Sequence, residues 1–237
     1  AIARAITPRT VAVVTVSPNN PTGAVYPESS LRALNALCAA RGIFHIHDEA
    51  YEYFTYGGAT HFSPGSLPGA AAHTISLYSL SKAYGMASWR IGYMVIPESL
   101  WDAVNKIQDT IAICPPLVSQ HVALSAVRVG AAYARARLDG LDALRRHTLA
   151  TLGDPRVPCD IPAAEGAFYH FLRVQSAVDP MTMTERLIRE HRVAVLPGSA
   201  FGAADGCYLR MSYGALDAET ATEGIRRLAD GLRAVVG

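Results

Sequence analysis

The chain has 237 residues, half of them hydrophobic and 17% charged, which is enough apolar sequence to bury a sizeable core. The formal net charge of +1 argues against nucleic acid or an anionic membrane as the main partner. Four well-separated cysteines form no CxxC pair, so we expect free thiols in a cytoplasmic protein. Only two of the 21 basic residues are lysine, Lys82 and Lys106. A chain that prefers arginine elsewhere can keep lysine where only an amine serves.

Residues 11–17 read VAVVTVS, the pattern of a strand that is covered on both faces. The dense turn signal PNNPTG follows at residues 18–23. Residues 28–41 predict a helix with one apolar face, which Gly42 ends. Further strands are expected at 43–47, 74–79 and 91–96, and a further helix at 97–111. This alternation predicts an α/β fold with a mixed, mostly parallel sheet sandwiched by helices.

The pattern changes after Pro115 and Pro116. A helix-rich stretch reaches about residue 152 and is followed by strand candidates at 168–172, 193–196 and 207–212. An amphipathic helix is expected at 217–235. We therefore predict two domains, a large one over residues 1–140 and a smaller α+β one over 141–237.

Polar side chains stand at the ends of the expected strands, where open α/β sheets bind their ligands. They are Asn20 in NPTG, Asp48 in HDEAY, Ser79, Ser81 and Lys82 in SLSK, and Arg90 in WRIG. A desolvated lysine amine can form a Schiff base with an aldehyde, and arginine with hydroxyls can hold a phosphate. A carboxylate can keep a pyridine nitrogen protonated. Pyridoxal phosphate requires these groups.

The chain resembles the class I/II aminotransferases, which are fold-type I pyridoxal-phosphate enzymes of the aspartate aminotransferase superfamily. Six stretches carry the resemblance in the family's order: SPNNPTGAVY, HDEAYEYF, SLSKAYGMASWRIGY, EGAFY, LPGSAFG and YLRMSYG. Complete members have roughly 400 residues, so the resemblance implies a C-terminal portion with an incomplete large domain. We expect the isolated chain to bind the cofactor weakly.

The resemblance implies a role for each matched residue around the cofactor ring. Lys82 would form the Schiff base and move the proton at the substrate Cα. Asp48 would pair with the pyridine nitrogen. Tyr51 and Asn20 would bond the phenolic oxygen.

The resemblance also assigns the residues that bind anions. Ser79, Ser81 and Arg90 would hold the phosphate, and Arg210, helped by Asn20, would bind the substrate carboxylate. The expected activity is transfer of an amino group between an α-amino acid and a 2-oxo acid by a ping-pong mechanism. Members work as homodimers with shared active sites, in amino-acid metabolism.

Several alternatives remain open. The same residues suit a pyridoxal-phosphate β-lyase (a C–S lyase) or cyclase, and a transcription regulator can carry an aminotransferase-like sensor domain. Each residue also has a structural interpretation: Asp48 as a loop cap, Asn20 as a turn residue and Arg210 as an ion-pair partner. His45 and His47 point to one face and suggest a metal, but without a second ligand cluster we expect none. The amino acid that is used stays undetermined.

Overall fold

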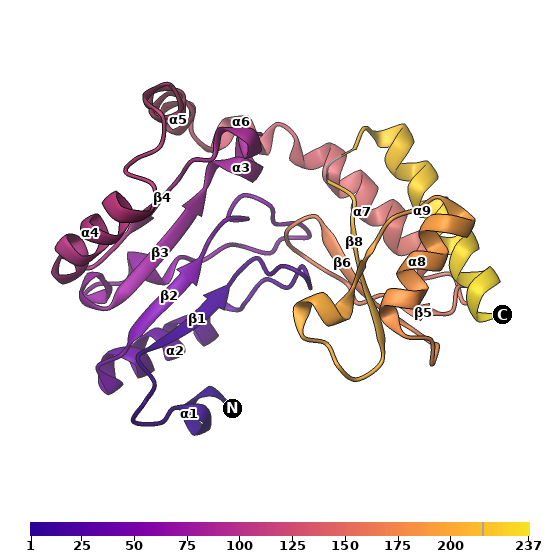
Figure 1. Cartoon of the computed structure of the whole chain (residues 1–237), viewed down its shortest axis with the longest axis horizontal. Helices are drawn as coiled ribbons and strands as arrows, with labels where there is room; N and C mark the ends of the chain where they lie inside the picture. Colours follow the sequence, from indigo (N-terminus) through magenta and orange to yellow (C-terminus); the bar gives the residue numbers. More distant parts are fainter. Residues whose placement is uncertain (215) are drawn as a thin grey trace. The chain divides into compact units, whose positions relative to one another are not determined.

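The computed structural model describes residues 1–214 and 216–237, which form two compact units (Figure 1). The first unit comprises Ala1–Pro18 and Val25–Arg135, and the second comprises Asn19–Ala24 and Ala136–Gly237. The second unit resumes at Ala136, a few residues before the boundary expected at 140. The turn at 19–24 belongs to the second unit, which the sequence did not predict.

A four-stranded sheet organises the first unit. Its strands are β1 (Ala12–Val16), β2 (Phe44–Asp48), β3 (Thr74–Ser79) and β4 (Gly92–Val95), in the order β1-β2-β3-β4. The first three strands are parallel, and β4 runs antiparallel to β3. The predicted mixed, mostly parallel sheet is therefore confirmed. Asp48 at the end of β2 pairs with Val16 on one side and Leu77 on the other, so the three parallel strands end at one edge.

The first unit contains six α-helices among its described residues. They are α1 (Ile2–Ala5), α2 (Glu28–Arg41), α3 (Leu80–Ala83), α4 (Trp101–Ile111), α5 (Leu117–Val129) and α6 (Ala131–Arg135). Short 3-10 turns occupy Pro64–Ser66, Ala70–Ala72, Ala87–Trp89 and Glu98–Leu100. Helix α2 has the predicted bounds, and Gly42 ends it in the left-handed conformation with φ 63°. Leu34 and Cys38 of α2 pack with Ile43 and Val13, which covers one face of the sheet.

The other face of this sheet is only partly covered. The pairing register places Val14, Ile46 and Ile75 on that face, and Val14 on the edge strand β1 is 63% exposed. The run VAVVTVS therefore forms the predicted strand, but the described residues do not cover it on both faces. Helices α4 and α5 also present apolar side chains to solvent, Trp101 and Leu117 among them.

The described residues of the second unit form an antiparallel sheet and three α-helices. The strands β5 (Cys159–Asp160), β6 (Tyr169–Val174), β7 (Leu196–Pro197) and β8 (Cys207–Ser212) lie in the order β5-β6-β8-β7. The helices are α7 (Leu138–Leu152), α8 (Pro180–His191) and α9 (Ala218–Val236), and a 3-10 turn spans Gly198–Phe201. Helices α7 and α8 both contact α9.

The hydrophobic core of the second unit lies between its sheet and these helices. Leu172 and Leu209 from the central strands meet Leu187 of α8 and Ile225 of α9, and all four are almost fully buried. The predicted α+β architecture of this part follows from that packing. Among the described residues, no helix is long and apolar enough to cross a membrane.

Candidate functional site

The lysine segment joins β3 directly to the short helix α3. The Ser79 side chain ends the strand and caps the helix, because its hydroxyl accepts a hydrogen bond of 3.2 Å from the Ser81 N–H. Leu80 and Ala83 are buried and anchor the helix. Lys82 lies half-buried on the same turn. A capped and anchored turn restricts where the lysine amine can reach.

Lys82 lies beside an aromatic ring from the segment after β2. Its Nζ atom is 5.9 Å from the ring centroid of Tyr51, which is buried against Phe54. A cation at this distance from a tyrosine face is weakly attracted to it. The structure thus brings together two of the residues that the sequence predicts for the cofactor.

Asp48 occupies the carboxyl end of β2, one strand away from β3. Its Oδ1 atom accepts a hydrogen bond of 2.9 Å from the Ala50 N–H, which turns the chain sharply after the strand. Tyr51 lies in this turn, three residues after Asp48. The bond fixes the Asp48 carboxylate at the start of the turn that contains Tyr51.

Arg90 precedes β4 and adopts a left-handed backbone with φ 51°. Its exposed guanidinium donates a hydrogen bond of 2.8 Å to the Ala87 carbonyl. The strand register pairs Gly92 of β4 with Ser79 of β3. Arg90 lies two residues before Gly92 in the chain. A left-handed non-glycine residue costs about 1–3 kcal/mol, and such strain is common at functional sites.

The second unit holds the other two predicted site residues, and it brings them into contact. Arg210 lies on β8 between β6 and β7, where its Nη1 atom donates a hydrogen bond of 3.0 Å to Asn20 Oδ1. The guanidinium carbon is 4.6 Å from the ring centroid of Tyr169 and 4.9 Å from that of Phe201. The Arg210 Nε atom is buried and has no hydrogen-bond partner among the described residues. Asn20 and the two rings therefore fix the orientation of the guanidinium, and its Nε–H group remains available as a hydrogen-bond donor.

The NPTG turn is fixed by its own hydrogen bonds and by packing within the second unit. The Gly23 N–H donates to the Asn19 carbonyl, and the Gly166 N–H donates to the Gly23 carbonyl, both at 2.8 Å. The Thr22 hydroxyl donates to Asn19 Oδ1 at 2.7 Å. These bonds hold the turn that presents Asn20 to Arg210.

The predicted site residues thus form two groups, each within its own unit. The first unit contains Asp48, Tyr51, Ser79, Ser81, Lys82 and Arg90, and the second contains Asn20 and Arg210. The contacts between Lys82 and Tyr51 and between Asn20 and Arg210 join predicted residues to one another.

A buried polar cluster lies beneath β2 and contains His45 and His47, the two histidines that the sequence places on one face. The Thr15 hydroxyl bonds His45 Nε2 at 2.8 Å and His47 Nδ1 at 2.6 Å, and Glu49 bonds His61 at 2.7 Å. Burial lowers the pKa of His45 and of His47 to about 4. For Glu49, burial opposes ionisation, but the hydrogen bonds it accepts outweigh this and lower its pKa. The alternation that places His45 and His47 on one face extends to Glu49, whereas His61 follows in a loop without periodicity and could not be predicted as part of the cluster.

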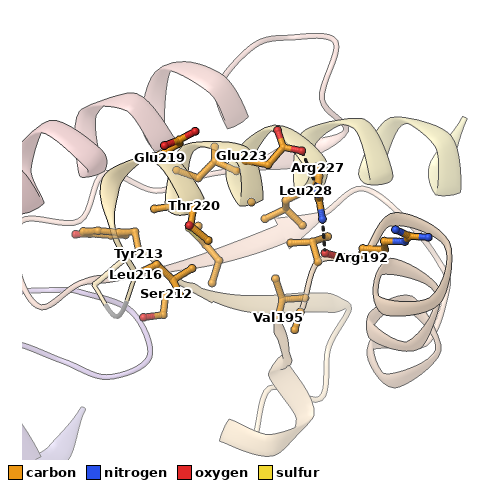
Figure 2. A pocket seen from close by; sticks show the side chains of 16 residues that line it. Arg192, Val195, Ser212, Tyr213, Leu216, Glu219, Thr220, Glu223, Arg227 and Leu228 are labelled. Atoms are coloured by element: carbon orange, nitrogen blue, oxygen red, sulfur yellow. Dashed lines mark hydrogen bonds and ion pairs between the residues drawn. The ribbon is translucent and has the colours of Figure 1, made fainter.

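The second unit also contains a pocket of about 520 Å³ beside α9 (Figure 2). Its walls include Val195, Tyr213 and Leu228 together with Glu223 and Arg227. Figure 2 shows Arg227 bonded to Glu223, at 2.7 Å, and to a backbone carbonyl. None of the predicted site residues lines this pocket.

Comparison with known proteins identifies the family. The family described as Aminotransferase class I and II matches residues 1–228, so the chain belongs to this family. Members of the family depend on pyridoxal phosphate. The predicted resemblance to class I/II aminotransferases is therefore confirmed, and so is the predicted α/β fold.

Individual relatives place the chain among named aminotransferases. It is 37% identical to the probable aspartate/prephenate aminotransferase of Aquifex aeolicus, over 97% of this chain and 59% of that protein. It is 34% identical to the aromatic-amino-acid aminotransferase 2 of Thermococcus litoralis, over 88% of this chain and 54% of that protein. A structure of Thermus thermophilus aspartate aminotransferase with maleate superposes with a TM-score of 0.83 at 32% identity, over 99% of this chain and 59% of the other. The chain therefore spans about three fifths of the length of these relatives.

Proposed function

We propose that this chain carries the lysine-bearing part of a pyridoxal-phosphate-dependent aminotransferase, which moves an amino group between an α-amino acid and a 2-oxo acid. The observation that carries the proposal is the position of Lys82. It lies on a capped turn directly after β3, beside the Tyr51 ring and one strand from Asp48. The relatives named above are aminotransferases, which favours amino transfer over the lyase, cyclase and regulator alternatives.

The donor groups of the first unit suit pyridoxal phosphate. Lys82 offers an amine for the aldehyde, and Asp48 offers a carboxylate for the ring nitrogen. Ser79, Ser81 and Arg90 offer hydroxyls and a guanidinium for the phosphate. Each of these residues lies on α3, at a strand end or just before a strand, where the fold holds its backbone.

The cofactor, when bound, supplies an aldehyde that condenses with amines and a ring that accepts an electron pair. Lys82 would move the proton at the substrate Cα. Asp48 would hold a proton on the pyridine nitrogen by its negative charge. Tyr51 and Asn20 would each offer a hydrogen bond to the phenolic oxygen, which would tune the basicity of the Schiff-base nitrogen.

We assign recognition of the substrate α-carboxylate to Arg210. A guanidinium binds a carboxylate through two parallel hydrogen bonds, and Arg210 retains a buried Nε donor without a partner among the described residues. Asn20 and the rings of Tyr169 and Phe201 hold the guanidinium in one orientation. The dicarboxylate named with the Thermus structure supports an anionic substrate for the family fold.

We also propose that the working protein is a cytoplasmic homodimer with shared active sites. The exposed apolar side chains on α4 and α5, such as Trp101 and Leu117, support burial of these helices by further protein. The four free cysteines support a reducing compartment.

Borohydride trapping tests the role of Lys82, and the second lysine provides a matched control. Because we expect weak cofactor binding, the chain is incubated with a concentration series of pyridoxal phosphate, reduced and digested, and the modified peptides are quantified by mass spectrometry at the lowest concentrations that give modification. We expect modification at Lys82, its loss in Lys82→Arg and its persistence in Lys106→Arg, because an arginine stays protonated and cannot condense. Equal modification of both lysines would contradict the assignment.

A half-reaction assay tests the chemistry. An α-amino acid donor should convert bound cofactor to its amine form, which is followed by the change in cofactor absorbance. Release of pyruvate and ammonia would instead indicate a lyase. Arg210→Lys should weaken donor binding by roughly 10- to 100-fold, because a point charge replaces two directed hydrogen bonds.

A further inference from the structure

Three side chains that can bind a metal meet on the α2-facing side of the first unit's sheet. His47 lies on β2, Glu49 follows that strand, and His61 comes from the loop beyond it. One ligand atom from each lies within 4.8 Å of the other two. His47 and Glu49 are fully buried, and the His61 side chain is 13% exposed. Two imidazoles and one carboxylate are a donor set that binds zinc in proteins.

The orientation of His47 is set by its neighbour on β1. Its Nδ1 atom lies 2.6 Å from the Thr15 hydroxyl, which leaves Nε2 for another partner. The Nε2 atom is buried and has no hydrogen-bond partner among the described residues. A buried polar atom without a partner is costly and uncommon in folded proteins. Metal-binding histidines usually hold their second nitrogen in a hydrogen bond of this kind.

Glu49 is also held in place, by a histidine and a hydroxyl. Its Oε2 atom accepts a hydrogen bond of 2.7 Å from His61 Nε2, and its Oε1 atom accepts one of 2.8 Å from the Ser63 hydroxyl. A cation that entered between Glu49 and His61 would replace the proton in their hydrogen bond, and that proton would move to His61 Nδ1, which has no hydrogen-bond partner among the described residues. The binding carboxylate would keep Ser63 as its support, as outer partners of metal ligands do.

We propose that His47, Glu49 and His61 bind a divalent cation of the zinc type, with water as the remaining ligand. Bonds of about 2.0–2.2 Å place two tetrahedral ligand atoms roughly 3.3 Å apart. The ligand atoms lie within 4.8 Å of one another, so side-chain movements on the order of an ångström would bring them to this spacing. The partly exposed edge of His61 gives the cation its route from solvent.

This site is separate from the residues assigned to the cofactor. His47 and Asp48 are consecutive residues of a strand, so their side chains point to opposite faces of the sheet. A bound cation would tie the end of β2 to the loop that carries Tyr51 and His61. The proposed metal site therefore does not depend on the proposed transferase activity.

Zinc titration of the metal-free chain, followed by calorimetry, provides the first test. We expect one zinc ion per chain. X-ray absorption of the zinc-loaded chain should show only nitrogen and oxygen ligands at about 2.0–2.2 Å. The absence of zinc binding, or sulfur ligands at about 2.3 Å, would overturn the proposal, since sulfur would place the ion on cysteine.

Variants locate the ion. Glu49→Gln keeps the shape of the side chain but removes its negative charge. Glu49→Gln and His47→Gln, made as separate variants, should each weaken zinc binding at least about 100-fold. His121→Gln makes the same chemical change on an exposed face of α5 and should leave the affinity unchanged. Circular dichroism confirms that each variant is folded. Equal zinc affinity in Glu49→Gln and His121→Gln would refute the site even if His47→Gln fails to fold.

Discussion

Replacing Gly23 by alanine tests how tightly the NPTG turn is seated in the second unit. Gly23 has φ 70°, and an added Cβ would lie 2.6 Å from the Ala164 Cβ and 2.9 Å from the Gly166 carbonyl oxygen. Ordinary contacts between such atoms are about 3.5–4.0 Å, so the backbone must move. The left-handed backbone costs about 1 kcal/mol for alanine, and overpacking adds roughly 1–3 kcal/mol.

Gly202 provides the matched control in the same unit. It has φ 81°, and an added Cβ would meet nothing within 4 Å. Gly202→Ala should therefore cost only the backbone contribution of about 1 kcal/mol. The difference between the two variants isolates the steric contribution.

Native-state hydrogen exchange is the appropriate assay, because it reports the opening free energy of individual segments. Peptides from β6 and β8 should exchange roughly 5- to 140-fold faster in Gly23→Ala than in Gly202→Ala, which corresponds to about 1–3 kcal/mol. Gly23→Ala should also loosen the contact between Asn20 and Arg210 and weaken carboxylate binding. Identical exchange in the two variants would show that the turn is not seated as described.

Three further predictions concern the second unit. Burial, helped by the charge of Arg145, lowers the pKa of His170 to about 4. Between pH 6.5 and 4 the unfolded chain then binds more protons than the folded one, so stability falls with falling pH by about 1.4 kcal/mol per pH unit from this group. His170→Gln should remove that part of the slope in urea unfolding, and an unchanged slope would exclude His170 as its source. Asp217 caps α9 by accepting from the Thr220 N–H at 2.9 Å, so Asp217→Ala should cost about 1 kcal/mol, whereas Asp217→Asn should cost less. Leu209 is fully buried on the central strand β8. Leu209→Ala should therefore lower the free energy of unfolding by about 2–5 kcal/mol. A loss below about 1 kcal/mol would show that Leu209 is not part of a close-packed core.

Elements with strong local signals could be predicted from the sequence. Helix α2 ends at Gly42 as expected, and β3 and β8 have the predicted bounds. The expected strand at 193–196 was largely wrong, because only Leu196 and Pro197 pair with β8. Apolar β-branched residues favour a strand, but a strand also needs a neighbour at the right register.

Direct contacts between distant residues could not be predicted from sequence patterns. Asn20 and Arg210 meet although 190 positions separate them, and no pattern of spacing encodes that contact. Thr15 joins two histidines of the neighbouring strand only because β1 and β2 pair in parallel. The family resemblance supplied the roles of Lys82 and Arg210, whereas their surroundings required the fold.

The assignment of residues 19–24 to the second unit has a practical consequence for dissecting the chain. A fragment of residues 136–237 would contain most of the second unit but would lack this turn. Arg210 would lose Asn20 as its partner, and Ala164 and Gly166 would lose the glycine that packs against them. A single cut cannot separate the two units, and an independently folding second unit would require the NPTG segment to be supplied along with it.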